Sequence, residues 1–141
     1  MTYNGNCLCE NIAFNINTEI HTLYHCHCSL CRKQSGTGGN AATLIQLASF
    51  QWLKGKAEIR SFQKPSGFRS DFCAHCGSPV PNIVHKTDWM WIPLGLLNET
   101  PDIKNRLHFC MNSKVAWLMT AQANHSYETL PETEKLFMHF K

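Results

Sequence analysis

The stretch Cys26-His27-Cys28-Ser29-Leu30-Cys31 places three cysteines within six residues of the chain. Two pairs, Cys7-x-Cys9 and Cys73-x-x-Cys76, lie on either side of it, and an eighth cysteine, Cys110, stands alone. Spacers of one or two residues let one turn of chain present two thiolates to the same metal ion. A chain of 141 residues can bury an adequate core without disulfides, so the clustered sulfurs indicate metal ligands or catalytic groups.

Zinc is the metal that this pattern favours, because structural zinc sites take four tetrahedral ligands at about 2.3 Å from sulfur. Cys73-x-x-Cys76 supplies half of such a site, and Cys7-x-Cys9 is the natural second half. The remaining three cysteines, Cys26, Cys28 and Cys31, would leave a fourth position open for water or substrate, as catalytic zinc sites do. Two ions are therefore expected. The spacing alone leaves the pairing open, since Cys7-x-Cys9 could also join Cys26 and Cys28.

Two other interpretations of the cysteines stay open. Seven sulfurs and one histidine could close two structural sites, with His25, His27 or His75 as the eighth ligand. A redox dithiol in one of the two C-x-x-C spacings is the other alternative, although such dithiols normally lie in a βαβ setting that is absent here.

Composition excludes several classes of protein. The chain is 43 % apolar and 16 % charged, which is typical of a folded domain, and we expect a single domain over residues 1–141. Thirteen basic and ten acidic residues give a formal net charge of +3, which is too small and too scattered to predict nucleic-acid binding. The N-terminus does not resemble a secretory signal, and the longest apolar run, Trp89–Leu97, is too short to span a bilayer. We therefore expect a cytoplasmic protein without a membrane span.

Short runs of strand-forming residues, separated by glycine, proline, asparagine and serine, predict a mainly β fold. The expected strands cover 12–16, 43–47, 57–62, 67–72, 80–84, 89–94 and 107–111. Helix is confined to two short segments: a turn capped by Ser29 and closed by Gly36, and a weaker candidate at Pro131–Phe140. Gly36, Gly38 and Gly39 suit a tight loop or a close approach of the backbone to a ligand.

Three segments together resemble the glutathione-dependent formaldehyde-activating enzyme family, which includes centromere protein V. They are Gly5-Asn6-Cys7-Leu8-Cys9, Cys26-His27-Cys28-Ser29-Leu30-Cys31-Arg32-Lys33-Gln34-Ser35-Gly36 and Phe72-Cys73-Ala74-His75-Cys76-Gly77-Ser78. The likeness extends to the segment Leu107–Trp117, so it covers most of the chain.

The resemblance implies a compact, mostly β, two-sheet zinc-binding fold with one or two short helical turns. It also implies that Cys7, Cys9, Cys73 and Cys76 hold a structural zinc ion, and that Cys26, Cys28 and Cys31 hold a catalytic one. The implied activity is that of a zinc-dependent carbon–sulfur lyase, which makes or breaks a thiol–aldehyde adduct such as S-hydroxymethylglutathione. Glutathione and an aldehyde are the expected partners, and a homo-oligomer is left open. The alternative is a zinc-stabilised binding or scaffold module without catalysis.

Several side chains near the central cysteines have candidate roles. Arg32, Lys33 and Ser35 could contact a thiol substrate, with the two cations receiving its carboxylates. The alternative for the two cations is a solvated helical turn. His27, between two ligands, should point away from the metal that they share.

Other residues are expected to lie in the core. Trp89, Trp91 and Trp117 are expected core residues, and Cys110 a small buried hydrophobe. Two positions depart from the family's usual pattern: Glu10 replaces a glycine after the first cysteine pair, and Cys110 replaces a bulky apolar residue.

Overall fold

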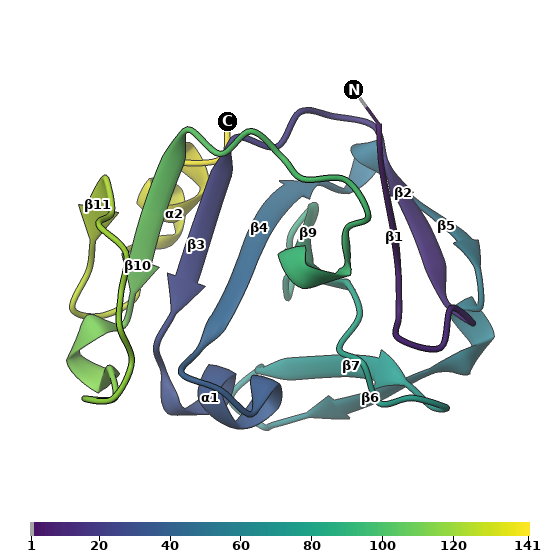
Figure 1. Ribbon diagram of the computed structural model, residues 1–141, viewed down its shortest axis with the longest axis horizontal. Coiled ribbons are helices and arrows are strands. Elements are labelled where there is room, and N and C mark those ends of the chain that lie inside the picture. The colour runs from purple at the N-terminus through teal and green to yellow at the C-terminus, as the bar shows by residue number, and fades with distance from the viewer. Residues whose placement is uncertain (1) are drawn as a thin grey trace. The chain divides into compact units, whose positions relative to one another are not determined.

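A computed structural model describes residues 2–141 of the protein (Figure 1). The chain divides into two compact units. Unit 1 comprises Met1–Glu19 and Leu44–Pro101, and unit 2 comprises Ile20–Thr43 and Asp102–Lys141. The boundary falls within strand β4 (Asn40–Gln46), which runs from unit 2 into unit 1. The expectation of a single domain over residues 1–141 stays a prediction.

Unit 1 contains three sets of paired strands. β2 (Ala13–Ile16) pairs antiparallel with both β1 (Tyr3–Asn6) and β5 (Phe50–Lys54). β6 (Ile59–Gln63) and β7 (Arg69–Cys73) form an antiparallel hairpin of their own. β9 (Trp89–Pro93) lies between β4 and the two-residue strand β8 (Asn82–Ile83). Turns of 3-10 helix cover Leu47–Ser49, Lys56–Glu58 and Leu94–Leu96.

The core of unit 1 follows from the alternation of side chains along its strands. Phe14 and Ile16 are fully buried on one face of β2, and Gly5 of β1 leaves room for the Phe14 ring. A second apolar cluster joins the two cysteine pairs, with Cys7, Ile12, Cys73 and Val80 buried together and Trp52, Ile59 and Cys76 packed against them. Two of the expected metal ligands are thus part of a hydrophobic core.

Unit 2 is built on a sheet with the strand order β11-β10-β3-β4. β10 (Asn105–Phe109) runs parallel to both β3 (Thr22–Cys26) and β11 (His125–Ser126), and β3 is antiparallel to β4. The segment after the C-terminal helix α2 (Thr133–Met138) packs against β3: the Thr22 hydroxyl donates to the His139 carbonyl at 2.9 Å, and the ring centroids of Phe140 and Tyr24 are 6.0 Å apart. A 3-10 turn at Met111–Ser113 follows β10.

Helix α1 (Ser29–Ser35) follows the central cysteines, as the sequence predicts, but its cap is different. Cys28, not Ser29, is the N-cap, and its sulfur accepts a hydrogen bond from the Cys31 amide at 3.4 Å. Ser29 is the first helical residue because the chain is still extended at Cys28. The expected closure at Gly36 is confirmed, with a left-handed φ of 73°.

The mainly β class with two short helices is confirmed, but the strands in residues 2–141 form three hydrogen-bonded sheets and not the expected two. Each of the seven expected strands overlaps an observed one, whereas β1, β3, β5 and β11 were not predicted. The β1 sequence is mostly polar, and β3 has half-buried residues in succession, so neither shows a clean alternation. The core prediction holds for Trp89, but Trp117 is 66 % exposed, because it lies in the loop after the Met111–Ser113 turn.

Candidate metal centres

The four cysteines Cys7, Cys9, Cys73 and Cys76 come together in unit 1, with their sulfur atoms all within 4.8 Å of one another. The sulfurs of Cys7 and Cys9 are 3.6 Å apart, and those of Cys9 and Cys73 are 3.7 Å apart. A tetrahedral ion with Zn–S bonds of about 2.3 Å separates its sulfur ligands by about 3.8 Å. The group therefore has the number, type and spacing of donors that a structural zinc site requires.

Backbone turns hold these four sulfurs in place. The Ile12 amide donates to the Cys7 sulfur and the His75 amide donates to the Cys73 sulfur, each at 3.4 Å. Gly77, with a φ of 75°, turns the chain after the second pair. Glu10 adopts a left-handed φ of 66°, so the turn after the first pair keeps a conformation that glycine adopts more easily.

Cys26, Cys28 and Cys31 form a second group in unit 2, and their sulfurs also lie within 4.8 Å of one another. Cys26 ends β3, Cys28 caps α1 and Cys31 lies in its first turn. Within the part of the chain that the structure describes, no fourth cysteine, histidine or carboxylate side chain completes this group. Three donors leave one tetrahedral position free for an exogenous ligand.

Hydrogen bonding among the three thiols of the second group shifts their pKa values in opposite directions. Hydrogen bonds from Cys26 and Cys31 lower the pKa of Cys28 to about 2, while the bond to Cys28 and burial raise the pKa of Cys26. Cys28 is therefore the thiol of the group that gives up its proton most readily. A cation placed among the three sulfurs would replace the thiol protons, since thiolates are the form that binds metals.

The two groups fit metal ions of the same kind. Thiolate donors select soft or borderline metals, and clusters of three or four cysteines are typical of zinc. His75, a candidate eighth ligand, instead forms a 2.7 Å contact with Glu58 through its Nε2 atom, and its side chain is exposed.

The expected substrate contacts lie on α1, directly after Cys31. Arg32 is half-buried, and its Nε–H is buried without a hydrogen-bond partner among residues 2–141. Lys33 is exposed. The Ser35 hydroxyl is used by the backbone instead: its oxygen lies 2.9 Å from the Cys31 carbonyl and 2.8 Å from the Gly39 carbonyl.

The backbone at Gly39 closely approaches another part of the protein and not a ligand: it lies against Cys26 and His25. A Cβ atom at this position would collide with the Cys26 carbonyl and with the His25 ring. The lack of a side chain at Gly39 therefore lets the loop after α1 pack against the strand that carries the first ligand.

His27 is fully buried, contacts His108 and is not a member of the three-cysteine group. The Nε2 atom of His27 lies 2.9 Å from Nδ1 of His108, and Nε2 of His108 lies 2.9 Å from the Ala121 carbonyl. A carbonyl oxygen only accepts, so His108 carries its proton on Nε2 and accepts at Nδ1 from the Nε2–H of His27. Burial, with His25 and His108 nearby, lowers the pKa of His27 to about 4, which keeps its ring neutral near pH 7.

The hydrogen bond between His27 and His108 holds the backbone between the two expected ligands Cys26 and Cys28 in place. The His27 amide also donates to the Phe109 carbonyl at 3.0 Å. Both the backbone and the side chain of His27 therefore form hydrogen bonds with β10. Sequence reasoning missed His108, because its contact depends on the register in which β10 pairs with β3.

Replacement of His108 by phenylalanine should loosen the second group. The variant removes the acceptor for the His27 N–H, and a buried donor without a partner costs about 1–3 kcal/mol. We expect metal release from the three-cysteine group to a chromogenic chelator to accelerate about tenfold. His108→Asn, whose Oδ1 can replace Nδ1 as acceptor, should restore part of the retention. Equal release rates for the two variants would refute a role for this hydrogen bond.

Cys110 is half-buried, where a fully buried side chain was expected. It directly follows Phe109, the β10 residue in register with Cys26, and it adopts a left-handed φ of 58°. Burial raises the pKa of its thiol, although a hydrogen bond to Cys26 opposes the shift. Its sulfur is close to the second group but is not one of its three members.

Comparison with known proteins identifies the family. A family model named glutathione-dependent formaldehyde-activating enzyme matches residues 2–113. A curated protein of Halomonas elongata named after the same family is 26 % identical over 133 residues, which is 84 % of this chain and 80 % of the relative. A crystal structure of a Rhodobacter sphaeroides protein shares the fold, with a TM-score of 0.57 and 17 % identity over 69 % of this chain and 89 % of that one.

None of the helices in residues 2–141 has the length and apolar character needed to span a membrane.

The family match takes in all seven clustered cysteines, and it extends past β10. The chain therefore belongs to the glutathione-dependent formaldehyde-activating enzyme family.

Proposed function

We propose that the protein holds two zinc ions and catalyses the formation or cleavage of a thiol–aldehyde adduct such as S-hydroxymethylglutathione. One observation carries the proposal: Cys26, Cys28 and Cys31 converge with one donor fewer than a tetrahedral ion takes. The four-cysteine group would have a structural role, because it supplies all four ligands of a tetrahedral ion and two of its cysteines lie in the core. Membership of an enzyme family supports a catalytic role.

The reaction needs no redox cofactor. The thiol sulfur bonds to the aldehyde carbon, the carbonyl double bond opens, and the thiol proton ends on the new hydroxyl oxygen. Zinc in the open site would supply a bound thiolate or a polarised carbonyl. The three cysteines hold the site, and the contact between His27 and His108 fixes the peptide that joins two of them.

Substrate binding would use the cations of α1. The unpartnered Nε–H of Arg32 can donate to a carboxylate, and Lys33 offers a second positive charge in the next position. Both follow Cys31 directly, so a substrate that places a thiol at the open site could place its carboxylates beside these two cations.

Seven clustered free thiols also fit a reducing compartment such as the cytoplasm.

Exchange NMR tests the activity directly. Glutathione and formaldehyde form the adduct without catalyst, so the exchange rate constant is measured with and without zinc-loaded protein at equilibrium. We expect the zinc-loaded protein to raise this constant at least about tenfold above background, and chelator treatment to abolish the increase. A fully loaded protein that leaves the exchange of glutathione and of small thiols unchanged would instead support a zinc-stabilised binding module.

A further inference from the structure

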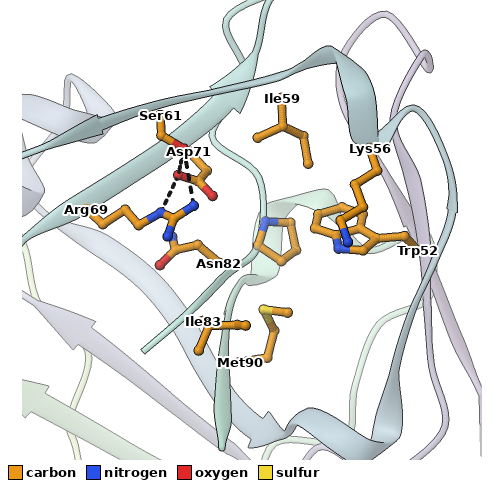
Figure 2. A pocket seen from close by; sticks show the side chains of 10 residues that line it. Trp52, Lys56, Ile59, Ser61, Arg69, Asp71, Asn82, Ile83 and Met90 are labelled. Atoms are coloured by element: carbon orange, nitrogen blue, oxygen red, sulfur yellow. Dashed lines mark hydrogen bonds and ion pairs between the residues drawn. The ribbon is translucent and has the colours of Figure 1, made fainter. Parts of the chain in front are cut away.

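Unit 1 contains a cavity of about 310 Å³ that the cysteine chemistry does not use (Figure 2). Trp52, Ile59 and Met90 supply apolar wall, and Lys56, Arg69 and Asp71 supply charge. Its volume is at the lower end of the range of small-molecule sites, and its mixture of apolar surface with a few charged groups is also typical of them. The cavity is therefore large enough for a small organic molecule.

Asp71 is the buried charge of this cavity, with 5 % of its surface exposed. Its Oδ1 atom accepts two hydrogen bonds, from the Ser61 hydroxyl at 2.6 Å and from Nε of Arg69 at 2.8 Å. Its Oδ2 atom has no hydrogen-bond partner among residues 2–141, and Figure 2 shows it turned toward the cavity. This oxygen is open to the cavity, so a ligand donor placed there could form a charge-assisted hydrogen bond with it.

The charges around the cavity do not cancel. Arg69 balances Asp71 through their ion pair. Lys56 lies across the cavity from this pair, beside Trp52, and makes no ion pair with any residue that the structure describes (Figure 2). One positive charge is thus left over, on the opposite side from the free carboxylate oxygen.

We propose that this cavity binds a short zwitterionic molecule of the dipeptide type. Its ammonium group donates to Oδ2 of Asp71, its carboxylate pairs with Lys56, and its apolar middle packs on Trp52 and Met90. Charge-assisted hydrogen bonds favour an ammonium donor over a neutral one at a carboxylate. The site uses no cysteine thiol, so it is independent of the proposed thiol–aldehyde activity.

The test uses the zinc-loaded full chain and the dipeptide alanyl-leucine, which has no thiol. Binding is followed through the NMR signals of the Trp52 indole N–H and the Asn82 side-chain amide. We expect a dissociation constant on the order of 0.1–1 mM. The N-acetylated dipeptide, which lacks the ammonium group, and the C-amidated dipeptide, which lacks the carboxylate, should each bind about tenfold more weakly.

Two lysine variants separate the site from general surface charge. Lys56→Ala should weaken binding about tenfold, whereas Lys54→Ala, which removes an exposed lysine outside the cavity, should leave it unchanged. Asp71→Asn, if it folds, should abolish the preference for a free ammonium group. The proposal is wrong if no binding appears up to about 10 mM, if both blocked dipeptides bind as well as the free one, or if the two lysine variants behave alike.

Discussion

Replacement of Cys28 by serine is expected to reduce the catalysed thiol–aldehyde exchange to background, a loss of about 100-fold, with the fold intact. Hydrogen bonds from Cys26 and Cys31 lower the pKa of Cys28, and removing one of three ligands should cost the zinc ion its site. Serine is itself a favoured N-cap, so its hydroxyl can accept from the Cys31 amide and α1 should keep its start. Metal analysis should give one zinc ion per chain in place of two.

Cys110→Ser is the matched control for this variant. It makes the same chemical change in a half-buried cysteine near Cys26 but outside the three-member group. We expect it to keep two zinc ions and the full exchange rate, with circular dichroism spectra of both variants like that of the parent protein. If Cys28→Ser keeps its rate, or if it loses both ions, then the assignment of catalysis and of separate metal groups is wrong.

The grouping of the cysteines could be predicted from the sequence because ligand spacing is a local property. A one- or two-residue spacer brings two sulfurs together whatever the rest of the fold does. The resemblance to a family then favoured one pairing among those that the spacing allowed. The structure brings the same seven cysteines into the same two groups.

The neighbours of the second group could not be predicted in this way. His27 and His108 are 81 positions apart in the chain, and they meet because β10 runs parallel to β3 in a particular register. Register between distant strands depends on packing of the whole sheet, which no local pattern reports. Asp71 was likewise not among the candidate residues, because the cavity that it lines is formed together with Trp52 and Met90 of other strands.

The prediction from local sequence also misplaced the N-cap of α1 by one residue. Serine is the commoner N-cap, so Ser29 was the natural prediction, but the sulfur of Cys28 takes this role. The cysteine can do so because it is already held beside Cys26 and Cys31. At Glu10, by contrast, the backbone keeps a left-handed turn although the side chain is unfavourable there, which indicates that the cysteine turn determines the conformation.

Replacement of Cys73 by serine should have the largest effect on stability. Cys73 is 1 % exposed and packs with Cys7, Ile12 and Val80, so the variant would both remove a ligand and place a hydroxyl in the core. Binding of structural zinc in small domains supplies about 10–16 kcal/mol, which is comparable to the whole stability of a domain. We expect the loss of one zinc ion and a fall in Tm of at least about 15 °C, measured by thermal unfolding with metal analysis.

Two further variants separate ligation from packing in this prediction. Cys9 is an exposed member of the same group, so Cys9→Ser removes a ligand without disturbing the core, and it should also lose one zinc ion and lower the Tm. His75→Ser changes an exposed residue between Cys73 and Cys76 that is not in the group, and it should keep both ions. A Cys9→Ser protein with two zinc ions and an unchanged Tm would show that these four cysteines stabilise the unit by packing alone. Loss of an ion from His75→Ser would instead place the histidine among the ligands.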